Sequence, residues 1–128
     1  MKSLPSGGIV LVEDDRDVRD ALVTLLEKLG YEALAFGSAE FALRHAVFDD
    51  ASCMVVDIHL PGMTGTEMVR QLRASRCLCP VVFITAHDDE HYRTESAELN
   101  AELLRKPFAA SVLKNALHRA LAARKDEP

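Results

Sequence analysis

Cys53-Met-Val-Val-Asp57-Ile-His-Leu-Pro-Gly-Met-Thr-Gly65 is the stretch of sequence that decides the fold. Its first four residues are apolar and predict a buried strand, which Asp57 closes. A carboxylate at the end of a buried strand costs free energy unless it is paired, bound to a cation or used in chemistry. The Pro61-Gly62 turn then leads the chain away from the strand. Asp57 therefore predicts a partner, a cation or a reaction at this strand end.

Other apolar segments also end in polar side chains, as the Asp57 segment does. These segments and the residues that follow them are Ile9–Val12 with Glu13, Asp14 and Asp15, residues 81–84 with Thr85, and residues 103–104 with the nearby Lys106. The carboxyl ends of parallel strands meet at one edge of a sheet, where ligands bind. If these strands lie parallel, their acids, hydroxyl and amine converge on one site.

Strand-like and helix-like segments alternate along the whole chain. The predicted strands cover residues 9–12, 33–36, 54–56, 81–84 and, briefly, 103–104. Apolar residues at helical spacing lie between most of them. Ser38 is a candidate N-cap for a helix running to about Val47, and Thr64 or Gly65 opens the helix after the third strand. Strands that are apolar without alternation need helices on both faces of their sheet. The pattern therefore predicts an α/β fold with a doubly wound parallel sheet.

The helix expected after Thr85 is the weakest predicted element. Between residues 87 and 99 its apolar contacts are limited to Tyr92, Ala97 and Leu99, which make a poor amphipathic stripe. We expect this helix to be short, irregular or mobile, or else an ordinary solvated helix with a thin apolar edge.

Length and composition bound the class of protein. A chain of 128 residues predicts one domain, which we place at residues 9–124 between tails at 1–8 and 125–128. Fifteen basic and twenty acidic residues give a net charge of -5 without a basic stripe, which argues against direct nucleic-acid binding. No signal peptide or membrane-length apolar segment is visible, so we expect a cytoplasmic protein with no membrane contact. The cysteines Cys53, Cys77 and Cys79 show no metal or redox spacing and are expected to be reduced thiols.

The polar strand ends suit phosphoryl chemistry. Carboxylates brought close together raise each other's pKa or recruit a cation, and the hard oxygens of Glu13, Asp14 and Asp57 suit Mg²⁺. Lys106 and Thr85 add an amine and a hydroxyl that can hold a tetrahedral oxyanion. Phosphoryl transfer needs mainly positioning and charge neutralisation, and an aspartate can serve as its nucleophile and give an acyl phosphate.

Together, these residues resemble a bacterial two-component response-regulator receiver domain. The resemblance runs from about Ile9 to Arg124, and its motifs are Val12-Glu-Asp-Asp15, Val55-Val-Asp-Ile-His-Leu-Pro-Gly-Met-Thr-Gly65, Phe83-Ile-Thr-Ala-His87 and Lys106-Pro-Phe108. It implies a flavodoxin-like (βα)5 fold with a five-stranded parallel sheet in the order 2-1-3-4-5. It also implies a signalling switch whose only catalysis is its own phosphotransfer and autodephosphorylation.

The resemblance assigns a role to each acidic residue. Asp57 would accept a phosphoryl group from a sensor histidine kinase or a phosphotransfer protein. Asp14 and Asp57 would bind Mg²⁺ directly, together with the backbone carbonyl of His59. Glu13 would act on the metal mainly through water, and Asp15 would be a spectator.

The same resemblance assigns roles at the other strand ends. Thr85 and Lys106 would contact the phosphoryl oxygens, and the Lys106–Pro107 bond would be cis. His59 and His87 would flank the mouth of the pocket, and our hypothesis is that they tune the lifetime of the phosphoryl group. A zinc site made by His59, His87 and His91 is an alternative, although it lacks a convincing fourth ligand.

Two departures from the family pattern concern signalling. Leu103 stands three residues before Lys106, where relatives usually carry Tyr or Phe, so the aromatic half of the usual switch is missing. The segment from Thr85 to Lys106 also looks one residue shorter than usual, near residues 100–102. The surface of the last two helices and the last strand could therefore respond to phosphorylation in an atypical way.

Two other functional classes remain as alternatives. A Mg²⁺-dependent phosphohydrolase with an aspartyl nucleophile would want a second acid two residues after Asp57, where His59 stands. A flavin module would need phosphate-binding residues where Glu13, Asp14 and Asp15 would repel the phosphate. The downstream partner is either an unknown protein or an effector domain missing from this chain, and the last helix could support a homodimer.

Overall fold

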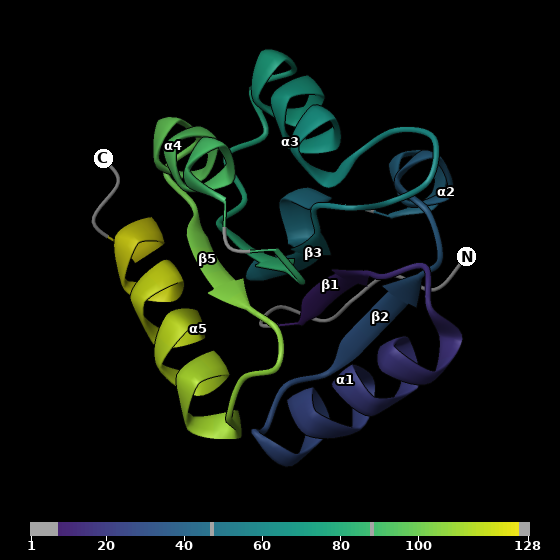
Figure 1. Ribbon diagram of the computed structural model, residues 1–128, viewed down its shortest axis with the longest axis vertical. Helices are drawn as coiled ribbons and strands as arrows, with labels where there is room; N and C mark the ends of the chain where they lie inside the picture. The colour runs from purple at the N-terminus through teal and green to yellow at the C-terminus, as the bar shows by residue number, and fades with distance from the viewer. Residues whose placement is uncertain (1–7, 47, 88, 126–128) are drawn as a thin grey trace.

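The computed structural model describes residues 8–46, 48–87 and 89–125, with the backbone alone for 124 and 125. Strands and helices alternate along the chain as predicted (Figure 1). The elements are β1 (Ile9–Val12), α1 (Arg16–Lys28), β2 (Ala33–Phe36), α2 (Ala39–His45), η1 (Phe48–Asp50), β3 (Cys53–Asp57), α3 (Gly65–Ala74), β4 (Val81–Thr85), α4 (Glu90–Glu98), β5 (Glu102–Arg105) and α5 (Ala110–Lys125).

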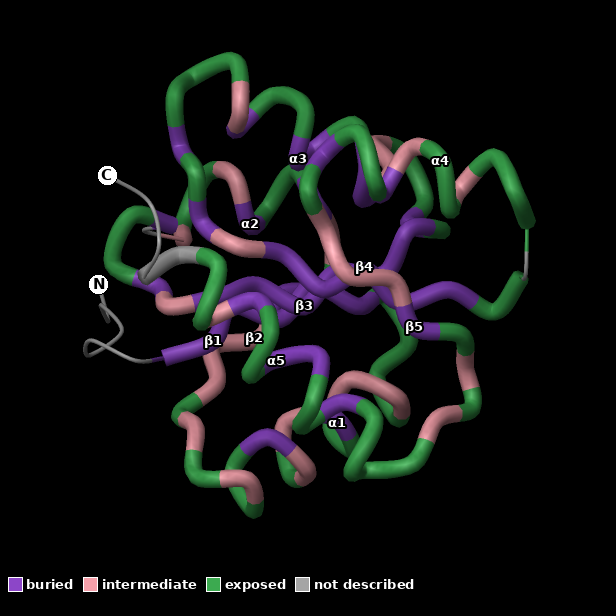
Figure 2. Tube along the Cα trace, turned by 90° about the vertical axis from the view of Figure 1, so that its left-hand side faces the viewer, coloured by how far each residue is buried: buried purple, intermediate pink, exposed green. Residues whose placement is uncertain are grey.

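The sheet is parallel and five-stranded, with the order β2-β1-β3-β4-β5. This confirms the predicted doubly wound topology. Its three central strands, β1, β3 and β4, are buried along their whole length, as the buried segments in the middle of Figure 2 show. Buried strands of this kind are the apolar runs without alternation from which the sheet was predicted.

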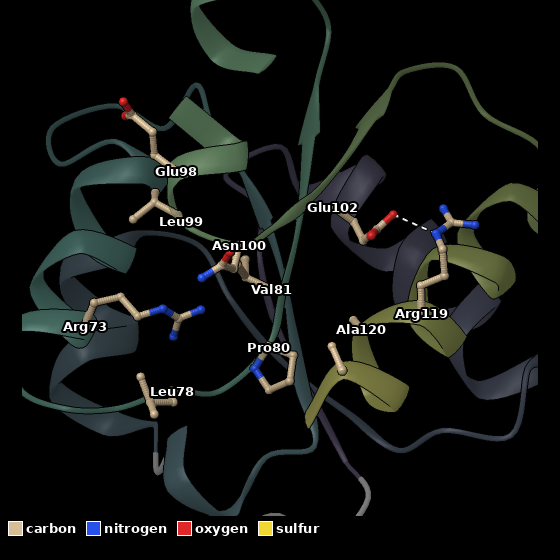
Figure 3. Close-up of a pocket in the computed structure, with 11 residues that line it drawn as sticks. Arg73, Leu78, Pro80, Val81, Glu98, Leu99, Asn100, Glu102, Arg119 and Ala120 are labelled. Atoms are coloured by element: carbon tan, nitrogen blue, oxygen red, sulfur yellow. Dashed lines mark hydrogen bonds and ion pairs between the residues drawn. The ribbon is translucent and has the colours of Figure 1, made fainter. Parts of the chain in front are cut away.

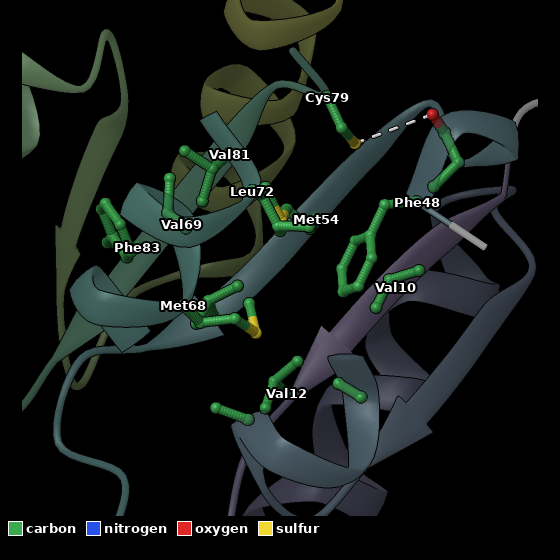
Figure 4. Packing of buried hydrophobic residues seen from close by; sticks show 14 of the residues in the cluster. Val10, Val12, Phe48, Met54, Met68, Val69, Leu72, Cys79, Val81 and Phe83 are labelled. Carbon is green, nitrogen blue, oxygen red and sulfur yellow. Dashed lines mark hydrogen bonds between the residues drawn. The ribbon is translucent and has the colours of Figure 1, made fainter. Parts of the chain in front are cut away.

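Two layers of helices cover the sheet, one on each face. Because successive side chains of a strand point to opposite faces, Val10 and Val12 pack on one side while Ile9 and Leu11 pack on the other. The first side carries α2, α3 and α4, and Figure 4 shows its interior around Met68. The second side carries α1 and α5 (Figure 1).

Local capping sets where the helices begin. The side chain of Ser38 accepts a hydrogen bond from the amide of Phe41 at 3.1 Å, which confirms it as the N-cap of α2. Thr64 caps α3 through a capping box with Glu67, so the helix begins at Gly65. The predicted end of α2 near Val47 lies outside the described residues, and the observed helix ends at His45.

The weakest predicted helix, α4, forms nine residues after the N-cap Asp89. Ser96 is its one buried residue, while Leu99 is buried just beyond its end. The thin apolar edge predicted from the sequence is therefore observed. None of the helices in residues 8–46, 48–87 and 89–125 is long and apolar enough to cross a membrane.

Candidate functional site

The carboxyl ends of β1, β3, β4 and β5 meet at one edge of the sheet. Strand register brings Val12 level with Val56, Asp57 with Ile84, and Thr85 with Arg105. The residues that follow these strands therefore face a common rim, and the amide of Lys106 donates to the carbonyl of Thr85 at 2.7 Å. The convergence expected from parallel strands is present.

Glu13, Asp14 and Asp57 form an acidic cluster at this rim. One carboxylate oxygen from each lies within 4.8 Å of the others, and in the part of the chain that the structure describes no other group of three His, Cys, Asp or Glu residues does this. Glu13 and Asp57 are buried, with 1% and 5% of their surface exposed, while Asp14 is exposed. An oxygen-only donor set that is open on one side fits Mg²⁺, which keeps several waters when bound to protein.

The described residues do not support the zinc alternative. His59, His87 and His91 are all described, and they do not form a group with mutually close ligand atoms. The side chain of His91 is 74% exposed and lies 3.8 Å from Glu95 instead.

Lys106 joins the two buried acids directly. Its Nζ donates to Glu13 Oε1 at 2.8 Å and to Asp57 Oδ2 at 3.0 Å. Burial lowers the pKa of Lys106, but the hydrogen bonds to Glu13 and Asp57 outweigh it and raise the pKa above the usual value. The more deeply buried Glu13 has a raised pKa because burial outweighs its hydrogen bond from Lys106. The ammonium group thus bridges the two buried acids and offsets part of their negative charge.

The peptide after Asp57 is held against its carboxylate. The amide of His59 donates to Asp57 Oδ1 at 2.8 Å, so both carboxylate oxygens accept a hydrogen bond. The loop then returns to the strand end, where the amide of Gly65 donates to the carbonyl of Ile58 at 3.0 Å. A Cβ atom at Gly65 would collide with the backbone carbonyl of Asp57. Only a glycine fits this close approach.

Thr85 is buried, and its hydroxyl has several partners. The hydroxyl accepts from the amide of His87 at 3.1 Å, can donate to the carbonyl of His87 at 3.2 Å, and lies 3.1 Å from Nε2 of His59. A threonine hydroxyl has one hydrogen to donate. When that hydrogen goes to the His87 carbonyl, His59 Nε2 must be the donor in the third contact.

Three neighbouring rings, those of His59, His87 and Tyr92, lie on the same side of the site as this hydroxyl. The ring of His59 meets the rings of His87 and Tyr92 edge-on, with centroids 4.8 and 4.9 Å apart. Tyr92 belongs to the first turn of α4, so the cluster connects the loop after β3 to that helix. Both histidines are exposed beside the buried Thr85.

The Lys106–Pro107 bond is cis, as the family resemblance implied. The structure also shows supporting residues that the sequence reading missed. Arg19 donates from Nη1 to the carbonyl of Glu13 at 2.9 Å, and Asp15, expected to be a spectator, is the N-cap of α1. Asp15 lies three residues before Val18, the first apolar position of that helix, so a search for capping residues would have found it.

A separate cavity lies away from the acidic cluster. A hollow of about 500 Å³ is lined by the beginnings of β4 and β5 and by the last turns of α3, α4 and α5 (Figure 3). Those strand ends are opposite to the ones that carry the acids. A smaller cavity of about 250 Å³ lies beside the site, with Thr85, His87, Ser96 and Leu103 among its lining residues.

Comparison with known proteins identifies the kind of domain that carries this site. The family model described as "Response regulator receiver domain" matches residues 9–118. The chain is 38% identical over 106 residues to Sensory transduction protein RegX3 of Mycolicibacterium smegmatis, covering 82% of this chain and 46% of that protein. It is 34% identical over 110 residues to Nodulation protein W of Bradyrhizobium diazoefficiens, covering 85% of this chain and 48% of that protein.

A solved structure shows the same likeness in three dimensions. The response regulator StyR superposes with a TM-score of 0.85 at 35% identity, over 94% of this chain and 63% of that one. The chain therefore spans about half the length of the curated relatives it matches, at 46% and 48% of theirs.

Proposed function

The chain belongs to the response regulator receiver domain family of two-component signalling, and we propose from this that Asp57 is its phosphoacceptor. A sensor histidine kinase or a phosphotransfer protein would be the donor. The observation that carries the proposal is the setting of Asp57, whose carboxylate ends β3 beside two other acids and 3.0 Å from Lys106. A phosphoryl group bound there would meet positive charge at once.

The residues present fit the magnesium ion that this chemistry requires. Asp14 and Asp57 would hold it directly with the backbone carbonyl of His59, and Glu13 would act through water. When bound, Mg²⁺ neutralises charge on the phosphoryl oxygens. The exposed Asp14 gives the donor set its open side.

The transfer itself needs little from the protein beyond positioning. One carboxylate oxygen of Asp57 forms a bond to phosphorus while the bond from phosphorus to the donor's imidazole nitrogen breaks, leaving an acyl phosphate. Lys106, released from part of its pairing with Glu13, would then contact a phosphoryl oxygen. Thr85 would turn its hydroxyl to another oxygen, which requires it to leave its present partners.

The change at Thr85 would be felt on the surface formed by α4, β5 and α5. We propose that this surface is the output face, read by a downstream protein or by an effector domain outside this chain, with a homodimer as one form of output. The acidic balance of the chain gives no support for direct contact with nucleic acid. The competing phosphohydrolase function needs a second acid at position 59. That position holds His59, whose Nε2 lies 3.1 Å from the Thr85 hydroxyl.

The test is incubation with Mg²⁺ and acetyl phosphate, followed by intact mass measurement. We expect the mass to increase by one phosphoryl group. The increase should not occur when Mg²⁺ is chelated before the reaction, nor in Asp57→Asn. The matched control is Asp49→Asn, an exposed acid in η1. A gain that persists in Asp57→Asn would place the phosphoryl group on another residue and refute the proposal.

A further inference from the structure

We infer that His59 is a positioning residue that holds the hydroxyl of Thr85 in the resting state and links it to α4 through Tyr92. The inference rests on the proposed function, because it concerns what Thr85 must leave when Asp57 is phosphorylated. It assigns the link between site and output face to an imidazole in the loop after β3.

The first support is the contact set of the hydroxyl. His59 Nε2 lies 3.1 Å from Thr85 Oγ1, and the two residues come from different strands' carboxyl ends, 26 positions apart in sequence. The other partners of this hydroxyl are the backbone amide and carbonyl of His87, two residues away. Because His87 belongs to the same loop, these local hydrogen bonds can persist when Thr85 and the loop move together. The bond to His59 must break if the hydroxyl turns towards Asp57.

The second support is the position of the His59 ring. Its edge-on contact with Tyr92 joins it to the first turn of α4, a helix that buries only Ser96 and whose later turns are tied to Arg70 of α3 through Glu95 and Glu98. Edge-on aromatic contacts of this kind are favourable. Moving Thr85 or the His59 ring therefore changes a contact that holds the first turn of α4.

The third support is the space on the β5 side. Leu103 stands where an aromatic ring would be expected, and a cavity of about 250 Å³ remains between Thr85, Ser96 and Leu103. Residues Glu102–Arg105 of β5 include no aromatic ring, so β5 gives Thr85 no ring contact like the one from His59 in the loop after β3. The contacts of His59 with Thr85 and Tyr92 connect this hydroxyl to α4.

The test uses hydrogen exchange of the α4 amides, residues 90–98, in the whole chain with and without phosphorylation. His59→Phe keeps a ring against Tyr92 but loses the bond to Thr85, while Tyr92→Leu keeps the bond and loses the ring contact. His118→Ala removes an exposed histidine on α5 and is the matched control. Exchange is compared at equal phosphorylated fraction, as measured by intact mass.

We expect phosphorylation of the wild-type protein to speed hydrogen exchange in the first turn of α4 by about fivefold. This is the size expected from losing one hydrogen bond, here the one between His59 and Thr85. Tyr92→Leu should show this faster exchange already without phosphorylation. In His59→Phe the change on phosphorylation should disappear, while His118→Ala should behave as wild type.

Thr85→Val supplies an independent variant that removes the hydroxyl and keeps the shape. Combined with His59→Phe, it should change resting α4 exchange no more than either substitution alone, because both remove the same bond. Additive effects would overturn the inference, as would an undiminished response to phosphorylation in His59→Phe or no response in the wild type. If the wild-type protein accepts no phosphoryl group, the proposed function fails. The α4 exchange rates of the unphosphorylated variants then still decide whether His59 holds Thr85.

Discussion

At the scale of single residues, the site is organised by the competition for two buried carboxylates. Lys106 pairs with both Glu13 and Asp57 and offsets part of their charge. A divalent ion at Asp14 and Asp57 would share Asp57 with the ammonium group. The lysine therefore stabilises the two buried acids of the cluster, while the exposed Asp14 is the acid most open to an ion from solvent.

Replacing Lys106 with methionine should destabilise the metal-free protein by about 3 kcal/mol, because it leaves two neighbouring acids buried without a partner. The measurement is urea unfolding, with Lys114→Met, an exposed lysine of α5, as control. The loss should be smaller in Mg²⁺, since the ion replaces the missing charge. Equal stability of Lys106→Met and wild type without metal would contradict this account of the cluster.

The pH dependence of this pairing has a definite sign. The folded protein raises the pKa of Lys106 above 10.5 despite burial, because the hydrogen bonds to Glu13 and Asp57 favour the charged form. The stabilisation is fully present below pH 10.5 and is lost as the pH rises through the folded value. As the pH rises above 10.5, the free energy of unfolding of the wild-type protein should fall more steeply than that of Lys106→Met, as measured by urea unfolding of both at a series of pH values. Identical slopes would show that the amine does not gain from its partners.

At the scale of elements, α4 and β5 differ from the rest of the fold. The central strands and α3 bury continuous apolar surface, whereas α4 contributes little. The hydroxyl of Ser96 is buried without a hydrogen-bond partner in the part of the chain that the structure describes. A helix with few apolar contacts and an unsatisfied polar group gains little stability from burial, so α4 depends more on contacts such as the ion pairs of Glu95 and Glu98 with Arg70.

Ser96→Ala should therefore stabilise the protein by about 1 kcal/mol, because it removes a buried hydroxyl that lacks a partner. Thr94→Ala is the matched control, since it also places alanine in α4 but at an exposed position. Thermal or urea unfolding of both variants isolates the effect of burial from that of helix propensity. A gain no larger than that of Thr94→Ala would show that the Ser96 hydroxyl is satisfied in solution.

Leu103→Tyr tests whether chemistry and switching are separate. Leu103 lies on β5 beside the cavity next to Thr85, while the acids and Lys106 meet at the strand ends. We expect the rate of phosphorylation by acetyl phosphate to stay nearly unchanged, as followed by intact mass over time. A large fall in that rate would show that the β5 position acts on the phosphoacceptor itself. Leu121→Tyr, a half-buried position on α5, serves as the control.

At the scale of the whole molecule, the site exists only when the fold is complete. Its acids, hydroxyl and amine come from the ends of β1, β3, β4 and the segment after β5, and no two neighbouring elements supply the set. Binding at this edge is therefore linked to global unfolding. An ion that binds the folded state but not the unfolded state must raise the free energy of unfolding by mass action.

Mg²⁺ should stabilise the wild-type protein by about 2.7 kcal/mol when its concentration is a hundred times the dissociation constant. Urea unfolding at increasing Mg²⁺ measures this, and the dependence should be largely lost in Asp57→Asn, which removes a carboxylate from the cluster. Asp49→Asn, outside the cluster, should keep it. A metal dependence that survives in Asp57→Asn would move the ion to another site.

The sequence by itself determined the alternation of strands and helices, the doubly wound sheet and the acids at strand ends. Each of these follows from the periodicity of nearby residues or from a polar residue that directly follows an apolar run. Only the tertiary structure decided that Lys106 bridges Glu13 and Asp57, which are 93 and 49 positions away, and that His59 reaches Thr85 and Tyr92. Such contacts depend on strand register, loop path and side-chain rotamers, because residues far apart in sequence meet only after the sheet has assembled.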